Sequence, residues 1–306
     1  MTRHRLAMIL GAVCGLCGCV SNDTPPSARA SGTKPPAAPP AVPVKSADTE
    51  AAKKLLTAAR SEARSGRIGG ALELLDRSIE ADPTLIGAIQ LRAKLRVLRG
   101  DHGGAADDYR KLTTLLAPSH NLLMRLGASL FFAGRFDASA RAFDRANRLR
   151  PERAAHNWQR GISLYYAGRF KEGRKQFELH RTVNPHDVEN AAWHYLCHAR
   201  EKNPQAAADG LIPIDTERDP RVPMAQIYDL FAGRGTEQQV LDAARDADTK
   251  QAHNYAHLYL GLWHEAHGRT RHTAEHIQKA AETYSLDHYM GQVSKVHWQR
   301  LKKAGR

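Results

Sequence analysis

The chain repeats one pattern of small, large and helix-ending residues from about residue 48 onward, which is typical of stacked helical hairpins. Each unit contains a glycine that recurs at a constant interval, a proline at its end, two small positions and one large position. In that order the residues are Gly66, Gly100, Gly134 and Gly168; Pro83, Pro118, Pro151 and Pro185; Ala59, Ala93, Gly127 and Gly161; Ala71, Ala105, Ser139 and Gly173; and Leu75, Tyr109, Phe143 and Phe177. We therefore predict two antiparallel helices in each unit.

The residue types explain why such a unit would fold as a hairpin. Small side chains let the two helices approach closely, glycine adopts the positive φ that ends the first helix, and proline stops the second. The pattern resembles the tetratricopeptide repeat (TPR), most closely over residues 120–151 and 154–185. The resemblance implies an all-α TPR α-solenoid with four repeats over residues 48–186, in which each hairpin buries its apolar face on its neighbour.

The repeat pattern weakens after residue 186. Residues 190–201 still read as a helix with Trp193, Leu196 and Cys197 facing inward, but prolines interrupt the chain after this helix. Short helices are expected again at 224–231 and 236–247, and Thr236 and Gln239 have the spacing of a capping box at the start of the second. We predict an irregular helical segment over residues 187–253.

Residues 254–302 return to the repeat pattern and then leave it. A final TPR-like hairpin is expected over 254–284, and a last helix begins at about residue 287. Its apolar residues Tyr289, Val293, Val296 and Leu301 fall along one stripe. We expect this C-terminal helix to cap the open end of the solenoid.

The segment 1–47 predicts export and attachment to a membrane. Arg3 and Arg5 precede an apolar stretch that is too short to span a bilayer. The sequence Leu16-Cys17-Gly18-Cys19 resembles the lipobox of bacterial lipoproteins, which implies a signal peptide over 1–18 and lipidation of Cys19. Val20 follows that cysteine, and the resemblance then implies the outer membrane, facing the periplasm. Residues 19–47 are rich in proline and alanine, so we predict a disordered tether.

Composition agrees with a helical chain and limits the partners. Hydrophobic residues make up 42%, charged residues 25% and aromatic residues 7%, which disfavours an all-β domain. The net charge of +13 is strongly basic, but the basic residues are spread over every repeat, so we interpret them as solvated helix faces and expect no nucleic acid. After cleavage only Cys19 and Cys197 remain, so no internal disulfide is expected, and Cys197 is interpreted as a small core residue.

The order of these segments resembles the NlpI family of TPR lipoproteins of the bacterial outer membrane, over roughly residues 48–302. That resemblance implies a non-enzymatic, dimeric scaffold that presents cell-wall hydrolases to a periplasmic protease. The longer tether and the basic charge of this chain depart from what the resemblance implies. The partners predicted here are therefore proteins or peptides of the cell envelope, with a homodimer as a further implication.

The inner groove of such a solenoid is the predicted binding site. The first helices of the third and fourth repeats would place there Asn121, Met124, Phe131, Trp158, Ile162 and Tyr165. These side chains form an apolar and aromatic surface that suits a peptide or helix with a few aromatic anchors. The alternative is that neighbouring aromatic residues such as Phe132 and Tyr166 simply pack between repeats.

Histidines offer the only candidates for a metal. Eight of the 16 histidines follow residue 252, and the pairs His253/His257 and His272/His276 have the spacing that places two imidazoles on one helical face. No aspartate or cysteine completes either pair, so we predict no metal, no cofactor and no catalytic residues. The functional hypotheses are an adaptor, a structural lipoprotein of a pilus, secretion or cell-wall assembly machine, and, least favoured, a metal-dependent hydrolase.

Overall fold

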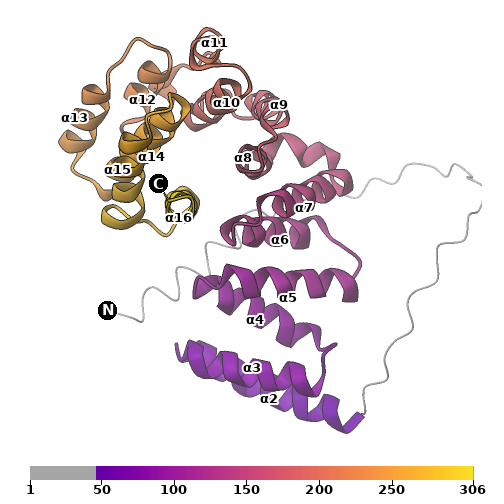
Figure 1. Cartoon of the computed structure of the whole chain (residues 1–306). Coiled ribbons are helices and arrows are strands. Elements are labelled where there is room, and N and C mark those ends of the chain that lie inside the picture. The colour runs from indigo at the N-terminus through magenta and orange to yellow at the C-terminus, as the bar shows by residue number, and fades with distance from the viewer. Residues whose placement is uncertain (1–45, 306) are drawn as a thin grey trace, which may run out of the picture. The chain divides into compact units, whose positions relative to one another are not determined.

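The computed structural model describes residues 46–305, and the structural statements below concern that part of the chain (Figure 1). The predicted signal peptide, the lipidation site Cys19 and nearly all of the tether lie outside the described residues. Contacts divide the described chain into two compact units, one ending at Leu95 and one beginning at Arg96. Within residues 46–305 every regular element is a helix, which confirms the predicted all-α fold.

The repeat region consists of helical hairpins. The first unit contains α2 (Ser46–Arg64), α3 (Ile68–Ala81) and most of α4 (Ile86–Leu98). The second unit continues with α5 (His102–Leu115), α6 (His120–Phe132), α7 (Phe136–Leu149), the short helix η1 (Pro151–His156), α8 (Trp158–Tyr166) and α9 (Phe170–Arg181). These elements match the hairpins that the repeat period predicts.

The four repeat glycines end helices as predicted. Gly66, Gly100, Gly134 and Gly168 have φ values of 77°, 77°, 73° and 75°. A Cβ atom at these positions would meet no atom within 4 Å. Glycine is therefore needed here for its backbone conformation and not because a larger side chain would clash. Residues with a Cβ adopt this left-handed conformation at a cost, whereas glycine does not.

Inside each hairpin, a small residue of the first helix lies against a large side chain of the second helix. A Cβ at Gly127 would lie 2.7 Å from Cε1 of Phe143, and a Cβ at Gly161 would lie 2.5 Å from Cζ of Phe177. In the first hairpin, where the small residue is Ala59, the large partner is Leu75, and both are buried in one cluster. The small residue of the first helix thus leaves room that the large side chain of the second helix fills.

The segment after residue 186 contains helices of uneven length, with a long connection between the second and the third of its α-helices. It contains α10 (Val188–Glu201), α11 (Pro204–Asp209), the short helix η2 (Thr216–Arg218), α12 (Met224–Phe231) and α13 (Glu237–Ala247). Trp193, Leu196 and Cys197 are buried, and Thr236 with Gln239 forms the predicted capping box. Gly233 has a φ of 73°, so α12 and α13 are joined by the same kind of glycine turn as the repeats.

The last helices form a hairpin followed by a returning helix. The hairpin consists of α14 (Lys250–Ala266), α15 (Thr270–Gln278) and the π-helical turn η3 (Lys279–Thr283), and α16 (Tyr289–Lys303) comes after it. Helix α16 packs on α14, α15 and η3 and also reaches back to α6 (Figure 1). Its first residue, Tyr289, places its ring centroid 4.8 Å from that of Phe132 and 4.7 Å from that of Trp158.

Among the described helices, none is both long enough and apolar enough to cross a lipid bilayer.

Candidate binding pocket

Three of the six predicted groove residues are buried inside the protein. Phe131, Ile162 and Tyr165 have exposed fractions of 0%, 1% and 2%. The ring of Tyr289 from α16 stacks 6.0 Å from Phe131, and the hydroxyl of Tyr165 donates to Glu265 at 3.1 Å. The expectation of an open groove is therefore corrected at Phe131 and Tyr165, because the C-terminal helices of the same chain cover them.

The other three residues keep contact with solvent. Asn121 is exposed, whereas Met124 and Trp158 are half-buried. The neighbouring aromatic residues contact the C-terminal helix, because Phe132 packs against Tyr289 and the hydroxyl of Tyr166 lies 2.8 Å from Nδ1 of His297. Whether any of the six residues binds a partner stays a prediction.

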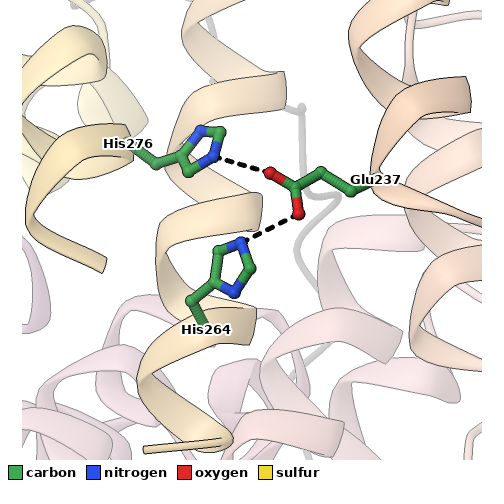
Figure 2. Close-up of side chains that lie close together, drawn as sticks. All are labelled: Glu237, His264 and His276. Atoms are coloured by element: carbon green, nitrogen blue, oxygen red, sulfur yellow. Dashed lines mark hydrogen bonds and ion pairs between the residues drawn. The ribbon is translucent and has the colours of Figure 1, made fainter. Parts of the chain in front are cut away.

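The structure places the histidines of the two pairs with a spacing of four in different surroundings. His276 on α15 contacts Glu237 on α13 (Figure 2), whereas His272 is exposed. His253 and His257 both stack on Tyr284. The packing of α13 against α14 and α15, and not the spacing within one helix, thus decides which imidazoles lie together.

A pocket of about 220 Å³ remains open beside Trp158. Its apolar walls come from α8, α9, α10 and α16 and are formed by Trp158, Ile162, Phe177, Trp193 and Met290. Its polar rim comes from the end of α9 and the start of α10 and is formed by His180, Asn184, Asp187, Glu189 and Asn190. Two of the predicted groove residues, Trp158 and Ile162, are therefore part of a concave site.

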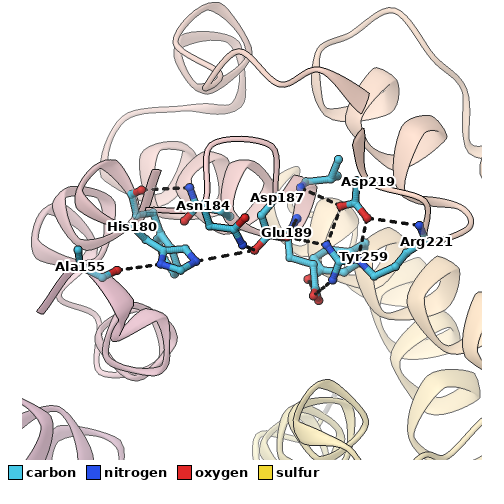
Figure 3. A network of polar contacts seen from close by, with 11 residues as sticks. Ala155, His180, Asn184, Asp187, Glu189, Asp219, Arg221 and Tyr259 are labelled. Carbon is cyan, nitrogen blue, oxygen red and sulfur yellow. Dashed lines mark hydrogen bonds and ion pairs between the residues drawn. The ribbon is translucent and has the colours of Figure 1, made fainter. Parts of the chain in front are cut away.

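An ionic network fixes the polar rim of the pocket (Figure 3). The guanidinium of Arg221 contacts Asp187 at 2.6 Å and Asp219 at 2.6 Å, and it also donates to Glu189. Asp219 in turn accepts the backbone N–H of Val188 at 3.1 Å, and the hydroxyl of Tyr259 donates to Glu189 at 2.7 Å. The start of α10 is thus held by side chains from two other segments.

The network leaves the rim acidic. One guanidinium faces three carboxyl groups, so the local charge is negative although the whole chain carries +13. Burial raises the pKa of Glu189, with a further contribution from Asp187, and Arg221 opposes that rise. Burial alone would raise the pKa of Asp219, but hydrogen bonds and charge attraction from Arg221 outweigh this effect. The pKa of Asp219 is therefore below its usual value. An apolar slot with such a rim suits a long side chain that ends in a cation.

Sequence reasoning missed Asp187, Glu189 and Met290. Asp187 precedes α10 as its N-cap and accepts the backbone N–H of Glu189 at 3.1 Å. An aspartate shortly after Pro185 is a recognisable helix-start signal, so Asp187 could have been placed at a helix terminus. Met290 could not, because only the return of α16 brings it to the pocket.

A buried histidine on α16 predicts a pH dependence of stability. Burial lowers the pKa of His297 from 6.5 to about 4, although Glu265 attracts a proton to it. The unfolded chain therefore takes up a proton between pH 6.5 and pH 4 that the folded chain does not, and stability falls as the pH falls through this range. We expect a loss of about 1–2 kcal/mol between pH 7 and pH 5 from this residue.

Urea unfolding of the wild-type protein and of His297→Asn at pH 7 and pH 5 measures this share. The variant should lose less stability on acidification than the wild type, whereas His156→Asn, at an exposed position, should lose as much as the wild type. Equal losses for all three proteins would show that His297 does not titrate differently on folding.

Comparison with known structures defines the class of fold. The chain is similar to a TPR protein from Parabacteroides merdae ATCC 43184, with 13% identity and a TM-score of 0.52, over 83% of this chain and 99% of that chain. It is also similar to YrrB, a TPR protein with an unusual peptide-binding site, with 17% identity and a TM-score of 0.46, over 65% of this chain and 98% of that chain. A third similarity is to PilW, a type IV pilus biogenesis factor, with 15% identity and a TM-score of 0.39, over 80% of this chain and 98% of that chain.

The first of these similarities shows the fold, and the described part of the chain accordingly has the fold of a TPR α-solenoid. No protein-family model matches the sequence, and no curated protein matches it.

Proposed function

We propose that this protein is a non-enzymatic adaptor of the bacterial cell envelope, anchored by lipidated Cys19 to the outer membrane and similar in role to the NlpI lipoproteins. The lipobox-like sequence at Leu16–Cys19 and the proline-rich stretch after it support the anchor and the tether. The TPR fold supports the binding of other proteins, because such folds present extended surfaces built from repeated hairpins.

The observation that carries the proposal is the pocket beside Trp158. An aromatic wall, a volume of about 220 Å³ and a rim that contains Asp187 and Glu189 are the features of a site for a single anchoring side chain. The carboxylates favour a lysine or arginine, whose aliphatic stem would lie on the indole of Trp158. The partner is thus expected to present a basic residue in an extended or helical segment.

The adaptor would act by raising the local concentration of one bound protein near another. The tether, residues 19–47, holds the folded part within reach of the membrane, and a second bound protein then meets the first at a high effective concentration. Cell-wall hydrolases and a periplasmic protease are the pair of clients that this proposal names.

Replacement of Trp158 tests the pocket directly. Capture of the tagged, lipidated protein from crosslinked envelopes, followed by mass spectrometry, should recover wall hydrolases or periplasmic proteases with the wild type. The same proteins should be depleted at least about tenfold with Trp158→Ala, since an aromatic anchor at the centre of an interface typically contributes about 2 kcal/mol or more.

A matched control is Trp263→Ala, because Trp263 is also half-buried but does not line this pocket. It should recover the same partners as the wild type. Unchanged capture by Trp158→Ala would exclude the pocket as the binding site. Recovery of only the subunits of one permanent machine would instead favour the assembly-lipoprotein hypothesis.

A further inference from the structure

We propose that Glu237, His264 and His276 form a binding site for a divalent transition-metal ion of the Zn²⁺ class. The three side chains come from different helices, α13, α14 and α15, and converge on one point (Figure 2). One ligand atom from each residue can be chosen such that all three lie within 4.8 Å of one another. This inference is independent of the adaptor function.

The geometry is that of three donors already oriented toward a common centre. Nε2 of His264 lies 3.1 Å from Oε2 of Glu237, and Nε2 of His276 lies 2.9 Å from Oε1 of the same carboxylate. An ion with ligand distances of about 2.0–2.2 Å would fit between these atoms after small side-chain movements. The two histidines are buried, so their positions are set by packing and not by solvent.

The donor set decides the class of ion. Two imidazole nitrogens and one carboxylate oxygen suit Zn²⁺ and its neighbours in the first transition series, whereas Mg²⁺ and Ca²⁺ prefer oxygen ligands alone. The two oxygens of Glu237 face one imidazole each, so the carboxylate lies between the two nitrogen ligands. Nε2 of each ring faces the carboxylate and would bind the ion through its electron pair, with the proton of that ring on Nδ1.

A further histidine can support one of the ligands. Nδ1 of His276 lies 2.8 Å from Nδ1 of His257, so one of these nitrogens donates a proton to the other. When Nε2 of His276 binds a metal, Nδ1 of that ring carries the proton and donates it to His257. A metal-bound histidine commonly makes such a hydrogen bond from its other nitrogen, because it fixes the orientation of the ring.

The site is accessible and would link three helices. A hollow of about 530 Å³ opens beside Glu237 and His276, which gives an ion a path from solvent. An ion bound there would join α13 to the hairpin of α14 and α15. Because the unfolded chain does not hold this arrangement, metal binding would also stabilise the fold.

Titration of the purified full chain, prepared without a polyhistidine tag, tests the site with Zn²⁺ alone. Calorimetry should show one strong site per chain, and Zn²⁺ but not Mg²⁺ should raise the thermal midpoint. Glu237→Gln and His276→Gln should each weaken binding at least about tenfold, since even loss of a residue that only supports a ligand costs about 10–100-fold. His156→Gln removes an exposed histidine of the same unit and should bind Zn²⁺ as the wild type does.

Two results would overturn the proposal. The first is a wild-type protein that binds Zn²⁺ no more tightly than Glu237→Gln, which would show that only scattered surface histidines bind the ion. The second uses Co²⁺ on the wild type and does not depend on the folding of any variant. Strong visible absorption bands are expected of an ion held in the low-coordinate protein site, and the weak spectrum of hydrated Co²⁺ would contradict the proposal.

Discussion

Replacement of Arg221 by methionine should destabilise the protein by about 3–5 kcal/mol. Arg221 is the one cation that the described part of the chain shows in contact with Asp187, Glu189 and Asp219 together. Without it, carboxylates that are largely withdrawn from water would face one another with no compensating charge. Urea unfolding at pH 7, followed by circular dichroism, measures the change in the free energy of unfolding.

The matched control is Arg234→Met. Arg234 also contacts an aspartate, Asp229 at 2.7 Å, but both side chains are about half exposed or more, at 62% and 49%. An exposed ion pair of this kind contributes about 0–1 kcal/mol. Similar losses for the two variants would show that the network around Arg221 behaves as an ordinary surface ion pair.

Replacement of Gly161 by alanine should destabilise the protein by about 2–3 kcal/mol, although alanine is the better helix former. The added methyl group would lie 2.5 Å from Cζ of Phe177. The ring of Phe177 is 1% exposed and packs against the ring of Trp193, so it cannot move aside without disturbing its neighbours. Thermal and urea unfolding of the variant measure the loss.

Two further variants show whether the clash between the added methyl group and Phe177 causes the loss of stability. Gly103→Ala, in α5, places a methyl group whose nearest neighbour is an Asp101 carboxylate oxygen 3.9 Å away, so it should be neutral or stabilising. Phe177→Leu combined with Gly161→Ala should be less destabilising than the sum of the two single changes, because the smaller side chain makes room. Additive losses would show that the methyl group and the ring do not meet.

Local features of the fold could be predicted from the sequence because they depend on residues close in the chain. A glycine at the end of a helix needs only its own backbone conformation, so Gly134 and Gly168 could be placed correctly. The capping box of Thr236 and Gln239 lies within one helical turn and was found for the same reason. Gly233 was missed because its distance from Gly168 along the chain is not a multiple of the interval that separates the repeat glycines.

The candidate sites depend on contacts between distant segments, and these were largely hidden from the sequence. The stripe on the last helix predicts that Val293 and Val296 are buried, and they are, but it does not say against which surface. The pocket needs Met290 beside Trp158, and the metal site needs Glu237 beside His276, which lies on another helix. Spacing along one helix cannot predict such contacts.

The return of α16 has a consequence for any partner that would use the buried aromatic residues. Phe131, which stacks on Tyr289 of α16, is accessible only in molecules whose α16 has left its place. The apparent dissociation constant for such a partner is the intrinsic one divided by the fraction of molecules in that state. Helix α16 thus competes with such a partner from within the same chain, with one copy of the competitor for each binding site. The contacts of Tyr289 and His297 that hold α16 in place determine how high the partner concentration must be.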